Sequence, residues 1–267
     1  MNSRALQSIT PAVKVILAIN IGIFLLINIV GEHIDLVQLL GMHLPGADHF
    51  GVYQYVTHMF THAGLMHVFF NMFAVFMFGC ILERVWGSKR FLVYYFATGL
   101  GAALLHSFVS WYEYYQLLEM YRAFQATPDV GLFAEFMREA GYELNASALN
   151  EWATRPELNA TYALDAARFY ERVISETLNV PTVGASGAVF GLLLAFGMLF
   201  PNTELMLMFI PIPIKAKYFV IGYGALELFM GIQHQTGDNV AHFAHLGGML
   251  FGFFIIRYWN KHSKRFY

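Results

Sequence analysis

Six apolar runs limit what this chain can fold into more than any other feature of the sequence. Each run is about as long as a helix needs to cross a bilayer. They cover approximately residues 12–30, 58–82, 91–110, 183–200, 218–233 and 241–259. The composition agrees, because 57% of the residues are apolar and only 13% are charged, as in polytopic membrane proteins. We therefore predict an all-α membrane protein with six transmembrane helices.

The Lys and Arg residues outside residues 111–181 gather on one side of these helices. They lie before or at the start of the first run, between the second and third and the fourth and fifth, and at or after the end of the sixth. They are Arg4, Lys14, Arg84, Lys89, Arg90, Lys215, Lys217, Arg257, Lys261, Lys264 and Arg265. The connecting segments 31–57 and 234–240 contain neither Lys nor Arg. By the positive-inside rule the basic side is cytoplasmic, so both termini are expected in the cytoplasm.

Residues 111–181 differ in character from the apolar runs on either side. They contain 11 acidic residues and five Arg but no Lys. One helical pattern covers residues 130–140 and ends at Gly141, and Asn159 is a candidate cap for a longer one that runs to Leu178. We expect an extracytoplasmic helical insert here, between the third and fourth transmembrane helices. The predicted organisation is helices 1–3 in residues 1–110, the insert in 111–181, and helices 4–6 with a cytoplasmic tail in 182–267.

The fourth run opens with a serine among small residues, Gly184-Ala185-Ser186-Gly187. Pro181 ends the preceding segment, and Thr182 is a plausible N-cap. In the first turn of a helix the backbone N–H groups have no intrahelical partner, so they and the helix dipole would stabilise an oxyanion beside the Ser186 hydroxyl. The alternative is a small-residue packing face, which is common where membrane helices approach closely.

The sixth run supplies a candidate base, His245. Small residues recur every four positions on the fourth and sixth helices and predict their close approach; they are Gly187, Gly191 and Ala195, and Ala244, Gly248 and Gly252. This packing would place His245 at the depth of Ser186, where it would take the hydroxyl proton and pass it to the leaving amine. No acid is spaced to orient His245 from a nearby turn, and Glu227 is expected on the fifth helix. We therefore predict a Ser–His dyad, with His242 as an interface histidine.

The second run begins with polar residues that are costly in a membrane and indicate function. His67 and Asn71 are four residues apart, so both project from one face of the helix, where they would bind an oxyanion together with the Ser186 N–H. A metal site formed by His58, His62 and His67 is the alternative. Their spacing fits no short helical ligand pair, and no carboxylate accompanies them. His58 and His62 are expected to be loop or interface residues.

At these positions the sequence resembles the rhomboid family of intramembrane serine proteases. The family's G-x-S-G is matched at 184–187, its H-x-x-x-N at His67 and Asn71, and its A-H-x-G-G-like segment at 244–248. The junction of the second and third helices, 83–91, is also similar. The resemblance covers about residues 12–110 and 182–259 and leaves out the insert, because family loops there are usually much shorter.

The resemblance implies that Ser186 and His245 are catalytic and that His67 and Asn71 support the oxyanion, with Gly184 in the same subsite. It implies transmembrane protein substrates and no cofactor or metal. We expect a multi-pass protein of the bacterial inner membrane, surrounded by the lipid bilayer and without a nucleic-acid partner. Two alternatives are a catalytically silent relative that binds membrane clients and a transporter. A transporter should show internal repeats and helices broken near mid-membrane, and the sequence has no repeat.

Overall fold

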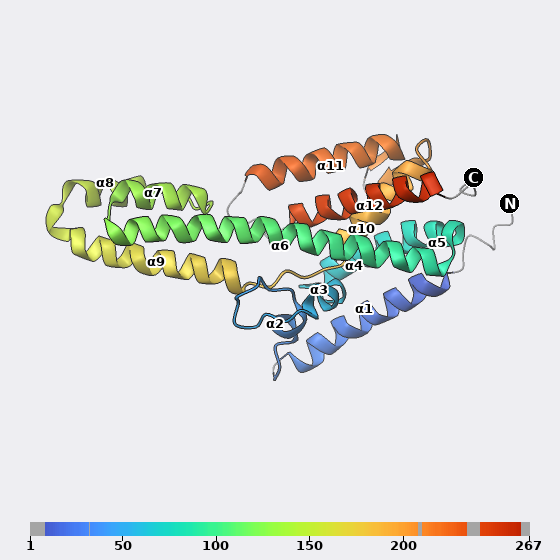
Figure 1. The fold of residues 1–267 in the computed structure, drawn as a ribbon, viewed down its shortest axis with the longest axis horizontal. Coiled ribbons are helices and arrows are strands. Elements are labelled where there is room, and N and C mark those ends of the chain that lie inside the picture. The colour runs from blue at the N-terminus through green and yellow to red at the C-terminus, as the bar shows by residue number, and fades with distance from the viewer. Residues whose placement is uncertain (1–8, 32, 208–209, 234–240, 263–267) are drawn as a thin grey trace.

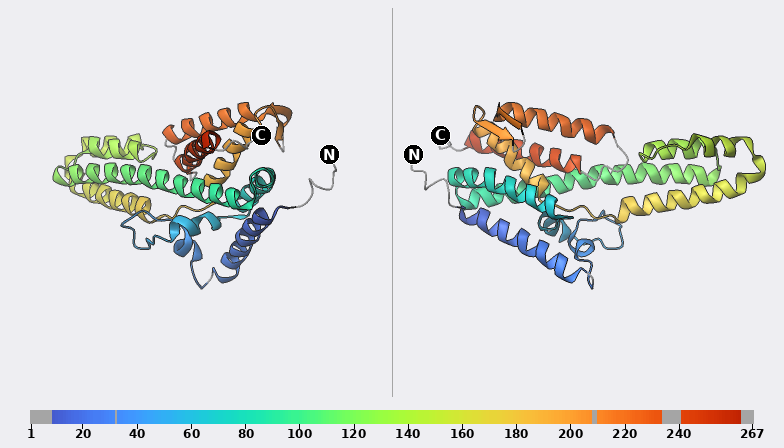
Figure 2. Two further views of the ribbon diagram at one scale, coloured as in Figure 1. Left: turned by 45° about the vertical axis from the view of Figure 1, so that its right-hand side comes forward. Right: turned by 180° about the vertical axis from the view of Figure 1, so that it is seen from behind.

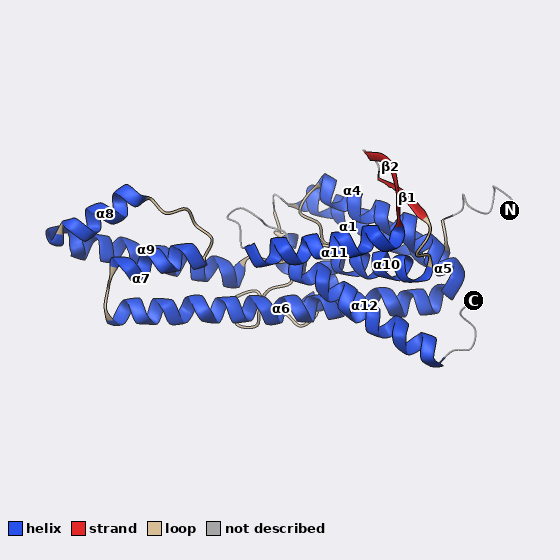
Figure 3. Cartoon of the chain, turned by 90° about the horizontal axis from the view of Figure 1, so that it is seen from above, coloured by secondary structure: helices blue, strands red, loops and turns tan. Residues whose placement is uncertain are grey.

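The computed structural model describes residues 9–31, 33–207, 210–233 and 241–262. Helices form most of it (Figure 3), with one small hairpin and connecting loops. The order of elements is α1 (Pro11–Val30), α2 (Leu36–Leu40), α3 (Gln54–Thr57), η2 (His58–Phe60), α4 (Leu65–Ala74), η3 (Val75–Gly79), α5 (Cys80–Trp86), α6 (Ser88–Ala126), α7 (Val130–Glu139), α8 (Ala146–Thr154), η4 (Pro156–Leu158), α9 (Asn159–Asn179), α10 (Ser186–Leu199), β1 (Glu204–Leu207), β2 (Ile210–Lys215), α11 (Ala216–Gln233) and α12 (His242–His262).

Each of the six predicted runs contains a helix, and a helix end differs from the prediction by more than four residues in two cases. The second helix begins at Leu65 rather than at residue 58, because the polar segment before it folds as α3, η2 and a loop. It then continues to Trp86 through one π-helical stretch, η3. The third helix continues past residue 110 to Ala126.

Three helices in the described part of the chain are long and apolar enough to cross a membrane. They are Pro11–Val30, Leu65–Trp86 and Ser88–Ala126. α10 is apolar but has only 14 residues. The count of six spans therefore stays a prediction.

The helices packed around α10 form one bundle. α1 begins at the same end of the molecule at which α12 ends (Figure 1). The basic residues Arg4, Lys264 and Arg265 lie outside the described residues.

The hairpin is the one departure from an all-α fold in the described residues. β1 and β2 pair antiparallel between α10 and α11, with Glu204 opposite Lys215. Pro211 and Pro213 lie in β2. Proline is tolerated in an edge strand because it lacks the N–H that an inner strand needs, and this hairpin has two edges and no inner strand.

α6, α10 and α12 pack closely at the centre of the bundle (Figure 2). The predicted small-residue ridges meet there. A Cβ atom added at Gly248 of α12 would lie 1.8 Å from the carbonyl oxygen of Gly187 on α10. This approach leaves no room for a side chain, so the ridges set the distance between the two helices that contain Ser186 and His245.

Glu83 fastens the start of α1 to the junction of α5 and α6. Its carboxylate accepts hydrogen bonds from the hydroxyl of Thr10, from Ala12 N at 2.9 Å, from Val13 N at 3.0 Å and from the Ser88 hydroxyl at 2.6 Å. A negative charge is favourable at a helix N-terminus, where the backbone N–H groups have no intrahelical partner. This buried carboxylate is therefore fully compensated.

Residues 111–181 form the outer half of α6 together with α7, α8 and α9. They enclose a hydrophobic cluster of their own around Phe124, Phe136 and Tyr170, separate from the cluster in the bundle. Asp129 accepts from two N–H groups at the start of α7, and Gly141 follows its end with a φ of 75°. Both predicted helices are present, but Asn159 is the first residue of α9 rather than its N-cap. Figure 1 shows these helices projecting from one end of the bundle.

Candidate active site

Ser186 is the first residue of α10. Thr182 is not its N-cap, as the sequence suggested, because Thr182 pairs with an earlier loop instead. Its backbone exchanges two hydrogen bonds of 2.8 Å with Met42, and its hydroxyl lies 2.8 Å from Nε2 of His106. The segment before α10 is therefore tied to the loop after α2 and to α6, which fixes where the helix starts.

Gly184 makes the turn into α10. Its φ of 123° lies in the region that favours glycine. A Cβ atom there would lie 2.7 Å from Nε2 of His67, so a side chain would also collide with that ring. The Gly184 N–H donates to the carbonyl of His58 at 2.9 Å. Gly184 thus allows the turn and leaves space for the ring of His67. Its own N–H is already hydrogen-bonded to His58.

His245 on α12 meets Ser186. Its Nε2 lies 2.8 Å from the Ser186 Oγ, the distance of a hydrogen bond between a hydroxyl donor and an imidazole acceptor. The ring also stacks on Phe190 of α10, with centroids 4.1 Å apart and planes inclined by 7°. The two residues that the sequence singled out are therefore brought together, 59 positions apart in the chain.

Glu227 departs from the prediction of an isolated dyad. It lies on α11, the fifth predicted helix, but its side chain reaches the ring nitrogen of His245 that does not face Ser186. One carboxylate oxygen, Oε2, lies 2.8 Å from Nδ1 of His245 and 2.6 Å from Nδ1 of His242. His242 is buried rather than exposed at an interface. The carboxylate is not within a turn of His245 in the sequence but on the neighbouring helix, so the spacing of residues does not reveal it.

Sequence reasoning had one signal for Glu227, namely a carboxylate inside an apolar helix. Such groups are expensive in a membrane and are paired or functional where they occur. Asp238, the other carboxylate near His245 in the sequence, lies outside the described residues.

His67 and Asn71 both lie on α4, as expected. His67 contacts the turn that leads to Ser186, whereas Asn71 contacts the backbone of His67. His67 packs against Gly184, and it lies close enough to His245 for the charges of the two rings to interact. Asn71 is buried, and its Nδ2 donates to the carbonyl of His67 at 2.9 Å. A role of either side chain at an oxyanion remains a prediction.

His58 and His62 belong to the segment before α4, and both are buried. Nδ1 of His58 lies 2.8 Å from the carbonyl of Gln54. Burial lowers the pKa of His58 to about 4. Burial, and less strongly the nearby His67, lower the pKa of His62 to about 3. Both rings are therefore neutral near pH 7 and belong to the packed interior rather than to an interface.

Three groups in the described residues have the composition of a metal site, but they are not the three histidines considered from the sequence. Glu227, His242 and His245 bring one oxygen and two nitrogens within 4.8 Å of one another. A tetrahedral zinc ion with bonds of about 2.0–2.1 Å holds its ligand atoms roughly 3.3 Å apart. The carboxylate oxygen lies closer than that to both nitrogens, at hydrogen-bond distance. The geometry is that of a hydrogen-bonded network.

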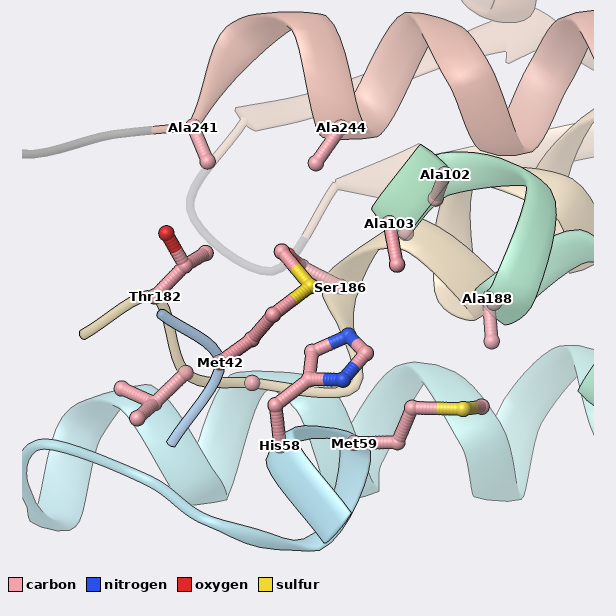
Figure 4. Close-up of a pocket in the computed structure, with 14 residues that line it drawn as sticks. Met42, His58, Met59, Ala102, Ala103, Thr182, Ser186, Ala188, Ala241 and Ala244 are labelled. Carbon is pink, nitrogen blue, oxygen red and sulfur yellow. The ribbon is translucent and has the colours of Figure 1, made fainter. Parts of the chain in front are cut away.

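A small cavity of about 20 Å³ adjoins Ser186 (Figure 4). Its walls are mostly small or apolar side chains from α6, α10 and α12, among them Ala102 and Ala244, with His58 and Thr182 on the loop side. A volume of this size holds about one water molecule. The described site is therefore closely packed, and a peptide segment would need the surrounding elements to separate.

The fold and the site together define a helical protein with apolar membrane-length helices and a serine hydroxyl hydrogen-bonded to a histidine in its interior. Residues 49–126 and 159–261 match the family model of the Rhomboid domain. This is more than half of the chain, and the protein therefore belongs to the rhomboid family, which is in general a family of intramembrane serine proteases. A comparison with curated proteins finds no match.

The family match differs in extent from the resemblance seen in the sequence. It begins at residue 49, so α1 lies outside it. It also includes the outer part of α6 and all of α9, and it leaves out residues 127–158, which contain α7, α8 and η4.

Proposed function

We propose that this protein is an intramembrane serine endopeptidase that hydrolyses peptide bonds in or near the transmembrane segments of membrane-protein substrates. The distance of 2.8 Å between Ser186 Oγ and His245 Nε2 supports this proposal most directly. Membership of the rhomboid family supports the substrate class. The multi-pass arrangement with both termini in the cytoplasm, in a bacterial inner membrane, is part of the same proposal.

In the acylation step, the Ser186 oxygen attacks the carbonyl carbon of the scissile bond. The hydroxyl proton moves to Nε2 of His245, which acts as the general base. The resulting oxyanion would be stabilised by N–H groups at the start of α10 and by His67 and Asn71. His245 then gives its proton to the amine nitrogen as the carbon–nitrogen bond breaks, which leaves an acyl group on Ser186.

Deacylation repeats this sequence with water as the nucleophile. His245 takes a proton from the water as its oxygen bonds to the acyl carbon, and it returns that proton to the Ser186 oxygen as the ester breaks. The products are a carboxylic acid and an unmodified serine. Since a peptide bond within a helix is shielded by its own hydrogen bonds, the substrate must unwind locally. Gly, Pro or polar residues near the cut make that easier.

Purified protein in detergent or liposomes, incubated with a generic transmembrane reporter, tests the proposal. We expect cleavage by the parent and labelling of Ser186 by a fluorophosphonate. Ser186→Ala and His245→Ala should each abolish cleavage while the melting temperature stays near that of the parent. Full activity in either variant would exclude the proposed mechanism. A parent that binds the reporter without cutting or labelling would indicate a catalytically silent relative.

A further inference from the structure

Glu227 holds two histidines with a single carboxylate oxygen. Oε2 lies 2.6 Å from Nδ1 of His242 and 2.8 Å from Nδ1 of His245. The carboxylate is 4% exposed, and both rings are buried as well. A buried carboxylate is tolerated only when hydrogen-bond donors or opposite charges compensate it, and the two Nδ1–H groups supply that compensation.

This contact determines which nitrogen of His245 carries its proton. An ionised carboxylate accepts hydrogen bonds and cannot donate them. Nδ1 of a neutral His245 must therefore carry the proton, which leaves a lone pair on Nε2. Nε2 is the nitrogen that faces the Ser186 hydroxyl, and only a lone pair there can accept the serine proton. The residue on α11 thus sets the tautomer that a general base needs.

We propose that Glu227 is a positioning residue that extends the Ser186–His245 pair to a triad, and that His242 holds Glu227 in this role. The proposal rests on the proposed function. Glu227 keeps its negative charge throughout the reaction. When Nε2 takes the serine proton, His245 becomes an imidazolium with two N–H groups, and Glu227 stabilises it through Nδ1–H. When the proton leaves for the amine, the neutral Nδ1–H tautomer returns.

A purely structural role is the main alternative, in which the contact only joins α11 to α12. The position of the contact argues against it, because Glu227 meets the one histidine that also meets Ser186. Phe190 already fixes the plane of that ring by stacking on it. Stacking does not determine the tautomer of His245. The carboxylate of Glu227 does, and this is a role that packing alone cannot fill.

Glu227→Gln tests the proposal, because it keeps the size of the side chain and removes the charge. We expect turnover to fall about 10²- to 10⁴-fold with little change in KM, as for removal of the carboxylate from other serine triads. Labelling of Ser186 by a fluorophosphonate should slow to a similar degree. The acid limb of the pH–rate profile should move to lower pH, since the imidazolium loses its counter-charge.

Glu83→Gln is the matched control. It also neutralises a buried carboxylate, but one bonded to Thr10, Ser88 and the start of α1. We expect a lower melting temperature with an unshifted pH–rate profile. The proposal would be overturned if both variants lost activity in proportion to their loss of stability and the pH–rate profile of Glu227→Gln did not shift. Glu227 would then have only a structural role.

His242 is tested separately by two substitutions. His242→Leu removes the second donor to Glu227, and His242→Gln supplies an N–H donor of similar reach. We expect turnover to fall about tenfold with leucine and to recover in part with glutamine. Parental turnover in His242→Leu would exclude His242 from the arrangement.

Other titratable groups lie around His245 and Glu227 and also affect the pH profile. These are His242 on the same helix, Tyr223 on α11, His67 on α4 and His106 on α6. All four remain in Glu227→Gln, so a shift between parent and variant reports the carboxylate.

Two measurements on the parent apply even if Glu227→Gln does not fold. In nitrogen-15 spectra of histidine-labelled protein, we expect His245 as the Nδ1–H tautomer, assigned by its absence in His245→Ala. The Nε2–H tautomer would overturn the proposal. Inhibition by EDTA that zinc reverses would do so too, because the three groups would then hold a metal. A parent that neither labels nor cleaves would instead refute the proposed function itself.

Discussion

Phe190 and Ser186 lie one turn apart on α10, and Phe190 stacks on the ring of His245 at a centroid distance of 4.1 Å. The helix that positions the hydroxyl therefore also positions the ring that faces it. Glycine contacts between α10 and α12 set the spacing behind this pair. The geometry of the pair thus depends on two packed helices rather than on a loop, which favours a preorganised site.

Asn71→Ala should lower kcat about 10²- to 10³-fold, the usual cost of losing one donor to an oxyanion. Some activity should remain because the N–H groups of α10 are unchanged. Apparent substrate binding should change little, because the lost donor acts on the oxyanion and not on the bound substrate. Asn28→Ala is a matched control, since its Nδ2 makes the same bond to the carbonyl four residues earlier, at 2.7 Å, on exposed α1. Steady-state kinetics on a transmembrane reporter measure both. A defect in KM alone would make Asn71 a substrate contact.

Gly248→Ala should destabilise the bundle strongly, because the added methyl would collide with the Gly187 carbonyl of α10. The helices must separate to admit it, which typically costs about 1–3 kcal/mol or more. Gly222→Ala on α11 is the control, since a Cβ atom there has no neighbour within 4 Å among the described residues. Melting temperatures in one detergent compare the two. Equal values would mean that the contact between α10 and α12 is not as close as described.

Stability should fall as the pH drops below about 6.5, the ordinary pKa of histidine. Burial lowers the pKa of His58 to about 4 and of His62 to about 3. Between these values and 6.5, the two histidines bind protons in the unfolded chain but stay neutral in the folded one. Each group can contribute up to about 1.4 kcal/mol per pH unit between its folded and unfolded values. His62→Phe should flatten the dependence of melting temperature on pH relative to the parent. An unchanged slope in His62→Phe would contradict the neutral, buried state.

Removal of the projecting helices should change which substrates are accepted. Replacing residues 115–179 by a short Gly/Ser linker removes α7, α8, α9 and the outer part of α6, together with all of their separate hydrophobic cluster. The cluster within the bundle stays intact. We expect the variant to cleave a bare transmembrane reporter as before. Cleavage of a reporter with a folded ectodomain should increase, because a steric barrier is gone.

The ratio of the two cleavage rates is the measurement, and it is independent of how much active protein each preparation contains. A ratio that stays constant in a stable and active deletion would leave these helices without a role in substrate selection. They would then be a surface addition, which chains often tolerate at small energetic cost.

The helical pattern and the pairing of Ser186 with His245 were predictable because both depend on local regularities. Apolar length indicates a membrane helix, and small residues at a spacing of four indicate where two helices meet. The Nε2–Oγ contact confirms the packing inferred from Gly187 and Gly248. These features need no knowledge of how distant loops fold.

Other features were not predictable because they depend on contacts between segments with no shared pattern. Thr182 resembled a helix cap, but its pairing with Met42 overrides that local preference. The carboxylate of Glu227 reaches His245 only because α11 packs beside α12 in a particular rotation, and neither helix has a pattern that specifies this rotation. The hairpin before α11 was not predicted because β2 contains two prolines, and proline normally indicates a loop rather than a strand.

α6 is an unbroken helix of 39 residues, and at a rise of 1.5 Å per residue it is about 58 Å long. The hydrocarbon core of a bilayer is only about 30 Å thick. The helix is therefore longer than the bilayer core is thick. It packs against α10 and α12 in the bundle and against α7 and α9 in its outer part. Under the proposed function, a substrate would approach Ser186 alongside the outer part of α6, and we expect the height of its soluble portion above the lipid, as well as its membrane segment, to decide whether it reaches the site.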